Sequence, residues 1–231
     1  MTKLLKKNKR KMSKRQRKKR MGKILRTGFV ILCILAIVIG IIKIVNPGLL
    51  TSRYFELSNE KIDASKPEID VDLLTVNPYS RPGSETGEIK GIVIHYTANP
   101  GSSAKANRDY FESLKDTHKT KVSSNFIVGL DGEIIQCVPT WEVAYASNDR
   151  NRDTVSIECC HPDENGKFTK DTYRSMVQLT SWLCMKFGLD EEDVIRHYDV
   201  TGKNCPKYFV EDEEAWNNFR EDVACALANT E

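Results

Sequence analysis

The chain has 231 residues, enough for one ordinary domain with an appendage and too few for several large domains. Its formal net charge of +3 is misleading, because 14 of the 35 Lys and Arg residues lie within residues 1–26, which contain no acidic residue. The rest of the chain carries 21 basic and 32 acidic residues, a net charge of −11. The two regions therefore have to be interpreted separately.

The basic block leads directly into residues 27–45, which are apolar except for Thr27 and Lys43. A membrane-spanning helix needs about 20 mainly apolar residues. The alternative is a cleaved signal peptide, whose apolar region is usually about 7–15 residues long and is followed by a small-residue cleavage site. The run here is longer, and residues 45–47 (VNP) make a poor cleavage site. We therefore predict one retained transmembrane helix.

The position of the basic block predicts the orientation of that helix. Lys and Arg concentrated before a span favour a cytoplasmic N-terminus, so the acidic body is expected outside the cytoplasmic membrane. A basic block can also bind nucleic acid, but its place beside the span favours anionic lipid. We predict a single-pass protein of the cell membrane, with residues 1–26 as a cytoplasmic tail and no nucleic-acid partner.

Residues 46–88 are predicted to form a linker or stalk. They contain four prolines and little apolar periodicity, although residues 71–76 are apolar enough to dock on a domain. The folded domain is then expected at residues 89–231. The seven cysteines define no disulfide pattern: Cys33 lies in the predicted span, and bridged and free thiols are both open for the others.

The domain region mixes two kinds of periodicity. Short β-branched runs bounded by turn residues predict strands, at residues 92–96, 125–130, 133–138, 153–159 and 194–197. The second and third flank Asp131 and Gly132, a strong hairpin signal. Helical spacing predicts helices over residues 103–116, from Thr169 to a stop at Gly188, and over residues 211–227. This order predicts an α/β (α+β) fold, a mixed β-sheet flanked by helices and preceded by the transmembrane helix.

Three side chains suggest a metal site. His95 ends a predicted buried strand, and His197 lies eight residues before Cys205. Imidazole and thiolate are ligands that Zn²⁺ favours. Each residue alone is more often a packed or satisfied side chain. Together they provide three ligands and leave one position open, as catalytic zinc sites do, so we predict Zn²⁺ and hydrolysis.

Glu158 and Lys203 are the candidate catalytic residues. Glu158 lies opposite the apolar side of the strand at 153–159 and could take a proton from water; otherwise it is a solvent-facing carboxylate. Lys203 could stabilise an oxyanion; otherwise it is a solvated loop lysine. Cys160 and His161 are weaker ligand candidates, because two consecutive ligands would distort the strand.

Four blocks, in this order, resemble the zinc-dependent N-acetylmuramoyl-L-alanine amidases of the type-2 group, to which peptidoglycan recognition proteins are related. They are residues 91–97 (GIVIHYT), 124–136 (SNFIVGLDGEIIQ), 151–158 (NRDTVSIE) and 197–206 (HYDVTGKNCP). The similarity covers roughly residues 89–209, about half the chain. Any one block would be weak, but four in order make the match specific.

The resemblance implies roles for individual residues. The metal ligands of the family correspond to His95, His197 and Cys205, its catalytic glutamate to Glu158, and its lysine near the third ligand to Lys203. The implied activity is hydrolysis, by zinc-activated water, of the amide between N-acetylmuramic acid and the first L-alanine of the peptidoglycan stem peptide. The alternative is a non-catalytic, membrane-anchored peptidoglycan-binding module, as in relatives that lack the cysteine. We expect a monomer.

Overall fold

The computed structural model describes residues 61–230. The predicted cytoplasmic tail at residues 1–26 and the predicted transmembrane helix at residues 27–45 lie outside the described residues. Between residues 61 and 230, no helix has both the length and the apolar character needed to cross a membrane.

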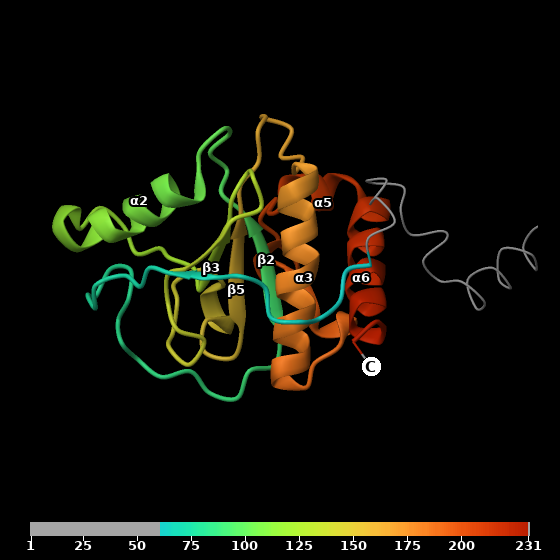
Figure 1. Cartoon of the computed structure of the whole chain (residues 1–231). Helices are drawn as coiled ribbons and strands as arrows, with labels where there is room; N and C mark the ends of the chain where they lie inside the picture. The colour runs from blue at the N-terminus through green and yellow to red at the C-terminus, as the bar shows by residue number, and fades with distance from the viewer. Residues whose placement is uncertain (1–60, 231) are drawn as a thin grey trace, which may run out of the picture. The chain divides into compact units, whose positions relative to one another are not determined.

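A six-stranded mixed sheet forms the centre of the described region (Figure 1). In spatial order its strands are β1 (Asp70–Val71), β4 (Ile134–Gln136), β3 (Phe126–Val128), β5 (Val155–Cys159), β2 (Ile92–Tyr96) and β6 (Val194–Arg196). Strands β3 and β4 pair antiparallel across the predicted hairpin, and the other neighbours pair in parallel. The mixed sheet flanked by helices, as predicted from the sequence, is confirmed.

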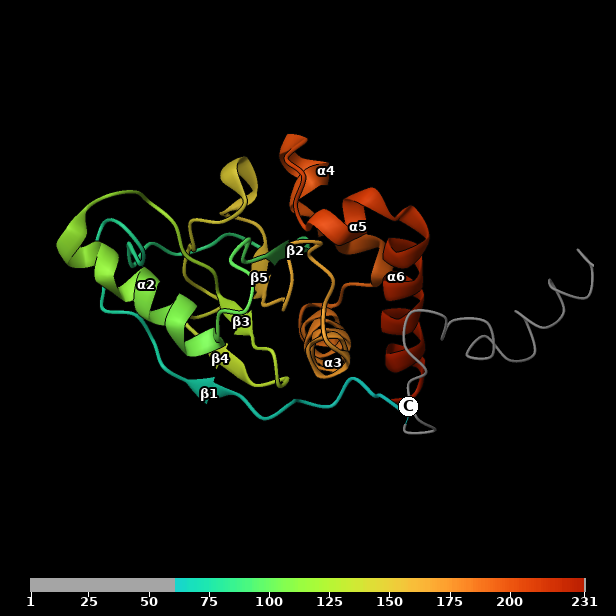
Figure 2. The same ribbon diagram turned by 90° about the horizontal axis from the view of Figure 1, so that it is seen from above.

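Different helices cover the two faces of this sheet (Figure 2). The α-helices are α2 (Ala104–Thr117), α3 (Lys170–Phe187), α4 (His197–Thr201), α5 (Lys207–Glu211) and α6 (Glu213–Ala228). Two 3₁₀ turns, η2 (Asn148–Arg150) and η3 (Glu191–Asp193), lie in the connections. Helices α3 and α6 pack on one face, and α2 packs on the other.

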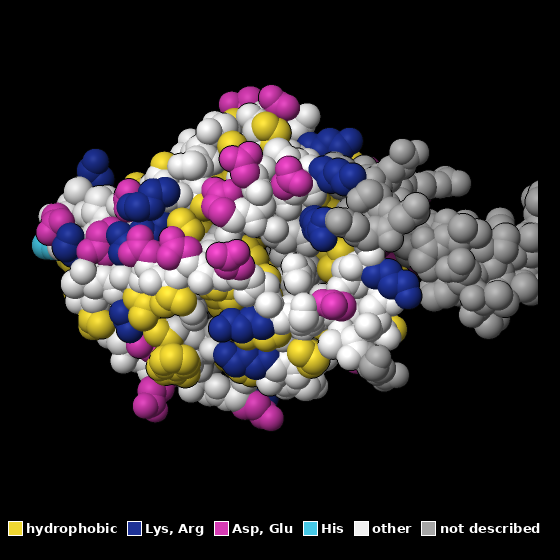
Figure 3. All heavy atoms as spheres, viewed as in Figure 1, with side chains coloured by type: hydrophobic (Ala, Val, Ile, Leu, Met, Phe, Trp, Pro, Cys, Tyr) yellow, Lys and Arg dark blue, Asp and Glu magenta, His cyan; other side chains and the backbone are white. Residues whose placement is uncertain are grey.

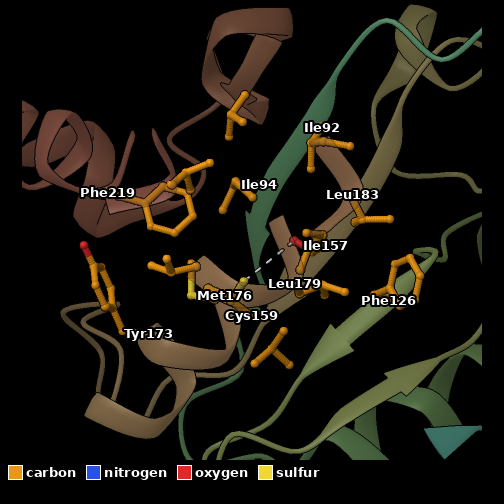
Figure 4. Close-up of a cluster of buried hydrophobic side chains, with 14 of the residues drawn as sticks. Ile92, Ile94, Phe126, Ile157, Cys159, Tyr173, Met176, Leu179, Leu183 and Phe219 are labelled. Carbon is orange, nitrogen blue, oxygen red and sulfur yellow. Dashed lines mark hydrogen bonds between the residues drawn. The ribbon is translucent and has the colours of Figure 1, made fainter. Parts of the chain in front are cut away.

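The larger core lies between the sheet and helices α3 and α6 (Figure 4). Ile92 and Ile94 of β2 and Ile157 of β5 are fully buried in it. They meet Met176 of α3 and Phe219 of α6, which are also fully buried. Because side chains alternate across a strand, the residues between these isoleucines point to the opposite face.

The ends of α3 follow directly from its sequence. The Thr169 hydroxyl accepts a hydrogen bond from the Thr172 backbone N–H and caps the first turn. Gly188 closes the helix at φ +69°, in the left-handed region where glycine carries no steric penalty. The predicted start and stop of this helix match the structure. The last helix, predicted at residues 211–227, is observed as α6 but begins at Glu213, because the Asp212 carboxylate caps it by accepting from the Ala215 N–H.

The described part of the predicted linker packs on the domain. Strand β1 pairs with β4, and Leu74 is buried beneath α2. The Arg81 guanidinium donates to both carboxylate oxygens of Glu142 at 2.8 and 2.7 Å. Part of the predicted linker or stalk therefore contacts the folded domain. Leu74 belongs to residues 71–76, the run that the sequence marked as apolar enough to dock on the domain.

Helix α2 presents its other side to solvent, where acidic and basic side chains alternate (Figure 3). Lys105 pairs with Asp109, and Lys115 with Glu112 at 3.3 Å. Exposed pairs of this kind stabilise a helix only slightly, by about 0.3–0.5 kcal/mol each. The helix is therefore held mainly by its buried face, which includes Phe111 and Leu114.

Candidate metal centre

His95, His197 and Cys205 converge at one end of the sheet. His95 is the fourth residue of β2, His197 begins α4, and Cys205 lies in the loop that leads to α5. All three are buried, and their ligand atoms lie within 4.8 Å of one another. The structure thus brings together the three residues that the sequence singled out, although 110 positions separate the first from the last.

The spacing within this group suits a tetrahedral ion. His95 Nδ1 lies 3.8 Å from Cys205 Sγ, and the two imidazole centroids are 4.6 Å apart. A tetrahedral zinc with Zn–N near 2.0–2.1 Å and Zn–S near 2.3 Å would hold its nitrogen and sulfur ligands about 3.6 Å apart. The donor set and its spacing therefore fit zinc.

The sheet and a buried arginine position the second histidine. Strands β2 and β6 are parallel neighbours, with Ile94 opposite Arg196. The chain therefore leaves both strands at the same end of the sheet. The Arg196 side chain donates to the Asp199 carboxylate at 2.9 and 3.1 Å and to Glu213 at 2.7 Å. These bonds fix the first turn of α4. The sequence predicted a strand through His197, but β6 ends at Arg196 and His197 is already helical.

Glu158 lies beside the three candidate ligands. It is the β5 residue in register with His95 on β2, and its side chain is on the face opposite Ile157. Its Oε2 atom is buried without a hydrogen-bond partner among the described residues. Burial raises the pKa of Glu158 to about 8, and the positive charge of Lys203 opposes that shift. The side chain as a whole is half-buried, but its Oε2 atom is shielded from solvent and can interact with a bound molecule.

Lys203 differs from Glu158 in being exposed to solvent. Burial is the main cause that lowers the pKa of His197, and the positive charge of Lys203 lowers it further. The Lys203 ammonium is therefore close enough to affect the site. No ion pair ties Lys203 to an acidic side chain within residues 61–230. It supplies positive charge at the rim.

Burial determines the charge state of the candidate ligands. It lowers the pKa of His95 well below the ordinary value, with further contributions from His197 and Lys203. Burial also raises the pKa of Cys205 to about 12. Without a cation the group is therefore two neutral imidazoles and a thiol. The imidazoles are already in the form that binds metal, whereas the thiol has to lose its proton.

The two weaker ligand candidates lie outside this group. The ring of His161 contacts the Asp163 carbonyl through Nδ1 at 2.8 Å. Cys160 is buried and accepts a hydrogen bond from the Asn107 amide. The six cysteines between residues 61 and 230 are free thiols.

Sequence reasoning missed two residues that contact the histidines. Ser147 Oγ lies 3.2 Å from His95 Nε2, and Asn148 Oδ1 lies 3.3 Å from His197 Nε2. They belong to a polar run, residues 147–151 (SNDRN), that looks in the sequence like any surface turn. Only its position above the sheet distinguishes it.

Comparison with known proteins agrees with this fold. The model of the N-acetylmuramoyl-L-alanine amidase family matches residues 85–208, which is more than half of the chain. This chain belongs to that family.

Curated relatives from Bacillus lead to the same family. Amidase CwlL of Bacillus licheniformis is 36% identical over 170 residues, covering 68% of this chain and 47% of its own. Amidase BlyA of Bacillus subtilis (strain 168) is 33% identical over 176 residues, covering 67% and 46%. The chain thus spans about half the length of the curated relatives it matches.

Solved structures share the architecture. The catalytic domain of XlyA superposes with a TM-score of 0.58 at 26% identity and covers 68% of this chain and 99% of its own. PlyL superposes with a TM-score of 0.60 at 24% identity, covering 69% and 99%, which is a likeness of fold. The region that matches is therefore a whole domain in those structures.

Proposed function

We propose that this chain is a zinc-dependent peptidoglycan amidase. It would hydrolyse the amide between the lactyl group of N-acetylmuramic acid and the first L-alanine of the stem peptide. One observation carries this proposal: three buried candidate ligands within 4.8 Å of one another lie next to a half-buried glutamate with one buried, unpartnered oxygen. Membership of the amidase family supports the same chemistry.

The chain's own residues fit a catalytic zinc ion. His95, His197 and Cys205 would hold it, and three ligands leave a tetrahedral ion one position for water or substrate. When bound there, zinc would act as a Lewis acid toward the carbonyl and lower the pKa of water. Since Cys205 has to release a proton on binding, the affinity of the site for zinc rises with pH.

Glu158 is the proposed general base. Its unpartnered Oε2 can accept a proton from the attacking water, and the same carboxyl can return a proton to the leaving amine of L-alanine. A divalent cation held by the neighbouring ligands favours the ionised form of this carboxyl. Lys203 is proposed to stabilise the negative charge that develops on the carbonyl oxygen.

The cellular setting is also a proposal. A transmembrane helix at residues 27–45, with residues 1–26 in the cytoplasm, would place the amidase domain outside the cytoplasmic membrane, where peptidoglycan lies. The 14 basic residues before the apolar run support this orientation. The proposed protein acts as a monomer, with peptidoglycan and membrane lipid as its partners.

Mass spectrometry of purified sacculi digested with the full chain tests the proposal. We expect release of stem peptides that begin with a free L-alanine amine, and loss of that release when a chelator removes zinc. Cys205→Ala should abolish release, because two histidines alone bind the ion weakly. Cys225→Ala, which alters a half-buried thiol on α6, is the matched control and should remain active. Tight binding to sacculi without zinc and without release would identify a binding module instead.

A further inference from the structure

One loop, residues 146–151, contacts both histidines of the metal centre through their Nε2 atoms. It provides no ligand itself. Ser147 Oγ contacts His95 Nε2 at 3.2 Å, and Asn148 Oδ1 contacts His197 Nε2 at 3.3 Å. Each of these two adjacent residues thus contacts the Nε2 atom of one imidazole.

The chemistry of the two contacts constrains the histidine tautomers. An amide oxygen only accepts hydrogen bonds, so His197 must carry its proton on Nε2. The Nδ1 lone pair of His197 is then free. In His95 it is Nδ1 that lies 3.8 Å from Cys205 Sγ, which leaves Nε2 to donate to the Ser147 hydroxyl. Which ring nitrogen binds a metal is set by the hydrogen bond that the other one makes.

We infer that Ser147 and Asn148 are positioning residues, which hold both histidines with the proton on Nε2 and present Nδ1 of each to the zinc ion. This inference rests on the proposed zinc site. It adds a function to a loop that supplies no ligand, and it specifies the nitrogen through which each imidazole binds.

The loop is built to hold this arrangement. The Asn151 side-chain oxygen accepts from the Ala146 and Ser147 backbone N–H groups at 3.0 and 2.5 Å. Asn148 has φ +51°, a left-handed conformation that asparagine tolerates far better than most residues. Ser147 is buried, whereas Asn148 is exposed. Asn148 can therefore be changed without opening a cavity.

Zinc affinity of the full chain, measured by competition with a chelator at fixed pH, tests the role of Asn148. Asn148→Gly removes the acceptor and keeps the positive φ, and we expect zinc binding to weaken about 10- to 100-fold, as for other residues that orient a ligand. Asn148→Asp keeps an acceptor and should bind at least as tightly as the wild type. Asp149→Asn, at the adjacent exposed position, is the control and should change nothing.

The protonation of the imidazole nitrogens provides a second readout, which needs no variant. NMR of the zinc-loaded wild type with ¹⁵N-labelled histidine should show Nε2–H and metal-bound Nδ1 for both His95 and His197. The inference is overturned if either residue binds zinc through Nε2, or if Asn148→Gly binds zinc within about twofold of the wild type. Failure of the wild type to bind zinc would instead overturn the proposed function.

Discussion

The two faces of the central strands carry side chains of different chemistry. On the α3 and α6 side, Ile92, Ile94 and Ile157 are fully buried among apolar neighbours. On the other side, the alternate residues of the same strands include His95 and Glu158. One strand therefore serves two purposes, because alternation places its stabilising residues and its reactive residues on opposite sides.

The face with His95 and Glu158 packs an apolar cluster under α2, but it also contains buried polar side chains that hydrogen bonds hold in place. Asn125 Oδ1 accepts from the Ser156 N–H and hydroxyl at 3.0 and 3.1 Å, and its amide nitrogen donates to the Pro139 carbonyl at 3.1 Å. Buried polar groups usually find such partners. Glu158 Oε2 has no such partner among residues 61–230, which is why this carboxyl is the one expected to act on a substrate.

The largest effect is expected from Glu158→Gln on the face that contains His95. Gln keeps the size of the side chain and removes the proton acceptor, so the rate of stem-peptide release should fall by about 10²- to 10⁴-fold. The free energy of unfolding should change little. Rate measurements on sacculi, paired with urea unfolding, check both; a rate near that of the wild type would remove Glu158 from the mechanism.

Ile157→Ala, one position away on the other face, should give the opposite result. The lost packing and the cavity left behind should lower the free energy of unfolding by about 2–5 kcal/mol. Zinc affinity and activity per folded molecule should stay close to wild type. Urea unfolding and zinc titration measure the two quantities. A specific loss of zinc binding in the folded variant would show that the faces are coupled.

The smallest effect is expected at Asp222, a carboxylate buried on the apolar side. It accepts a hydrogen bond from the Tyr173 hydroxyl at 2.6 Å, and burial raises its pKa to about 6. The folded state thus holds this proton more tightly than the unfolded chain, in which an Asp titrates near pH 3.9. Its contribution to stability is greatest below pH 4 and is lost as the pH rises through 6.

Asp222→Asn removes this titration while leaving an acceptor for Tyr173. Relative to the wild type, the variant should gain stability between pH 4 and pH 6, by about 2–3 kcal/mol, because the pKa of Asp222 lies about two units above that of an unfolded Asp. Urea unfolding at pH 4, 5 and 7 measures the difference. If the difference in the free energy of unfolding between the variant and the wild type stayed constant with pH, Asp222 would not titrate in this range.

Local sequence patterns anticipated much of the fold. The strand predicted at residues 92–96 has those bounds in β2, and Thr169 and Gly188 bound α3 as predicted. These features depend on neighbours in the chain: β-branched runs, caps and turn glycines. The apolar character of residues 71–76 marked them as able to dock, but their partners under α2 depend on segments far away in the chain.

The candidate site likewise has features that the local sequence predicts and features that depend on the tertiary structure. The sequence alone specified the types of donor, two imidazoles and a thiol, together with a carboxyl on the polar side of a strand. The tertiary structure decided that β2, β5 and β6 lie side by side, and that residues 146–151 reach the far nitrogens of both rings. Strand order and register are long-range properties, because they follow from the mutual burial of segments far apart in the chain. The residue type thus determines the chemistry of each ligand, whereas the geometry that brings the ligands together exists only in the folded domain.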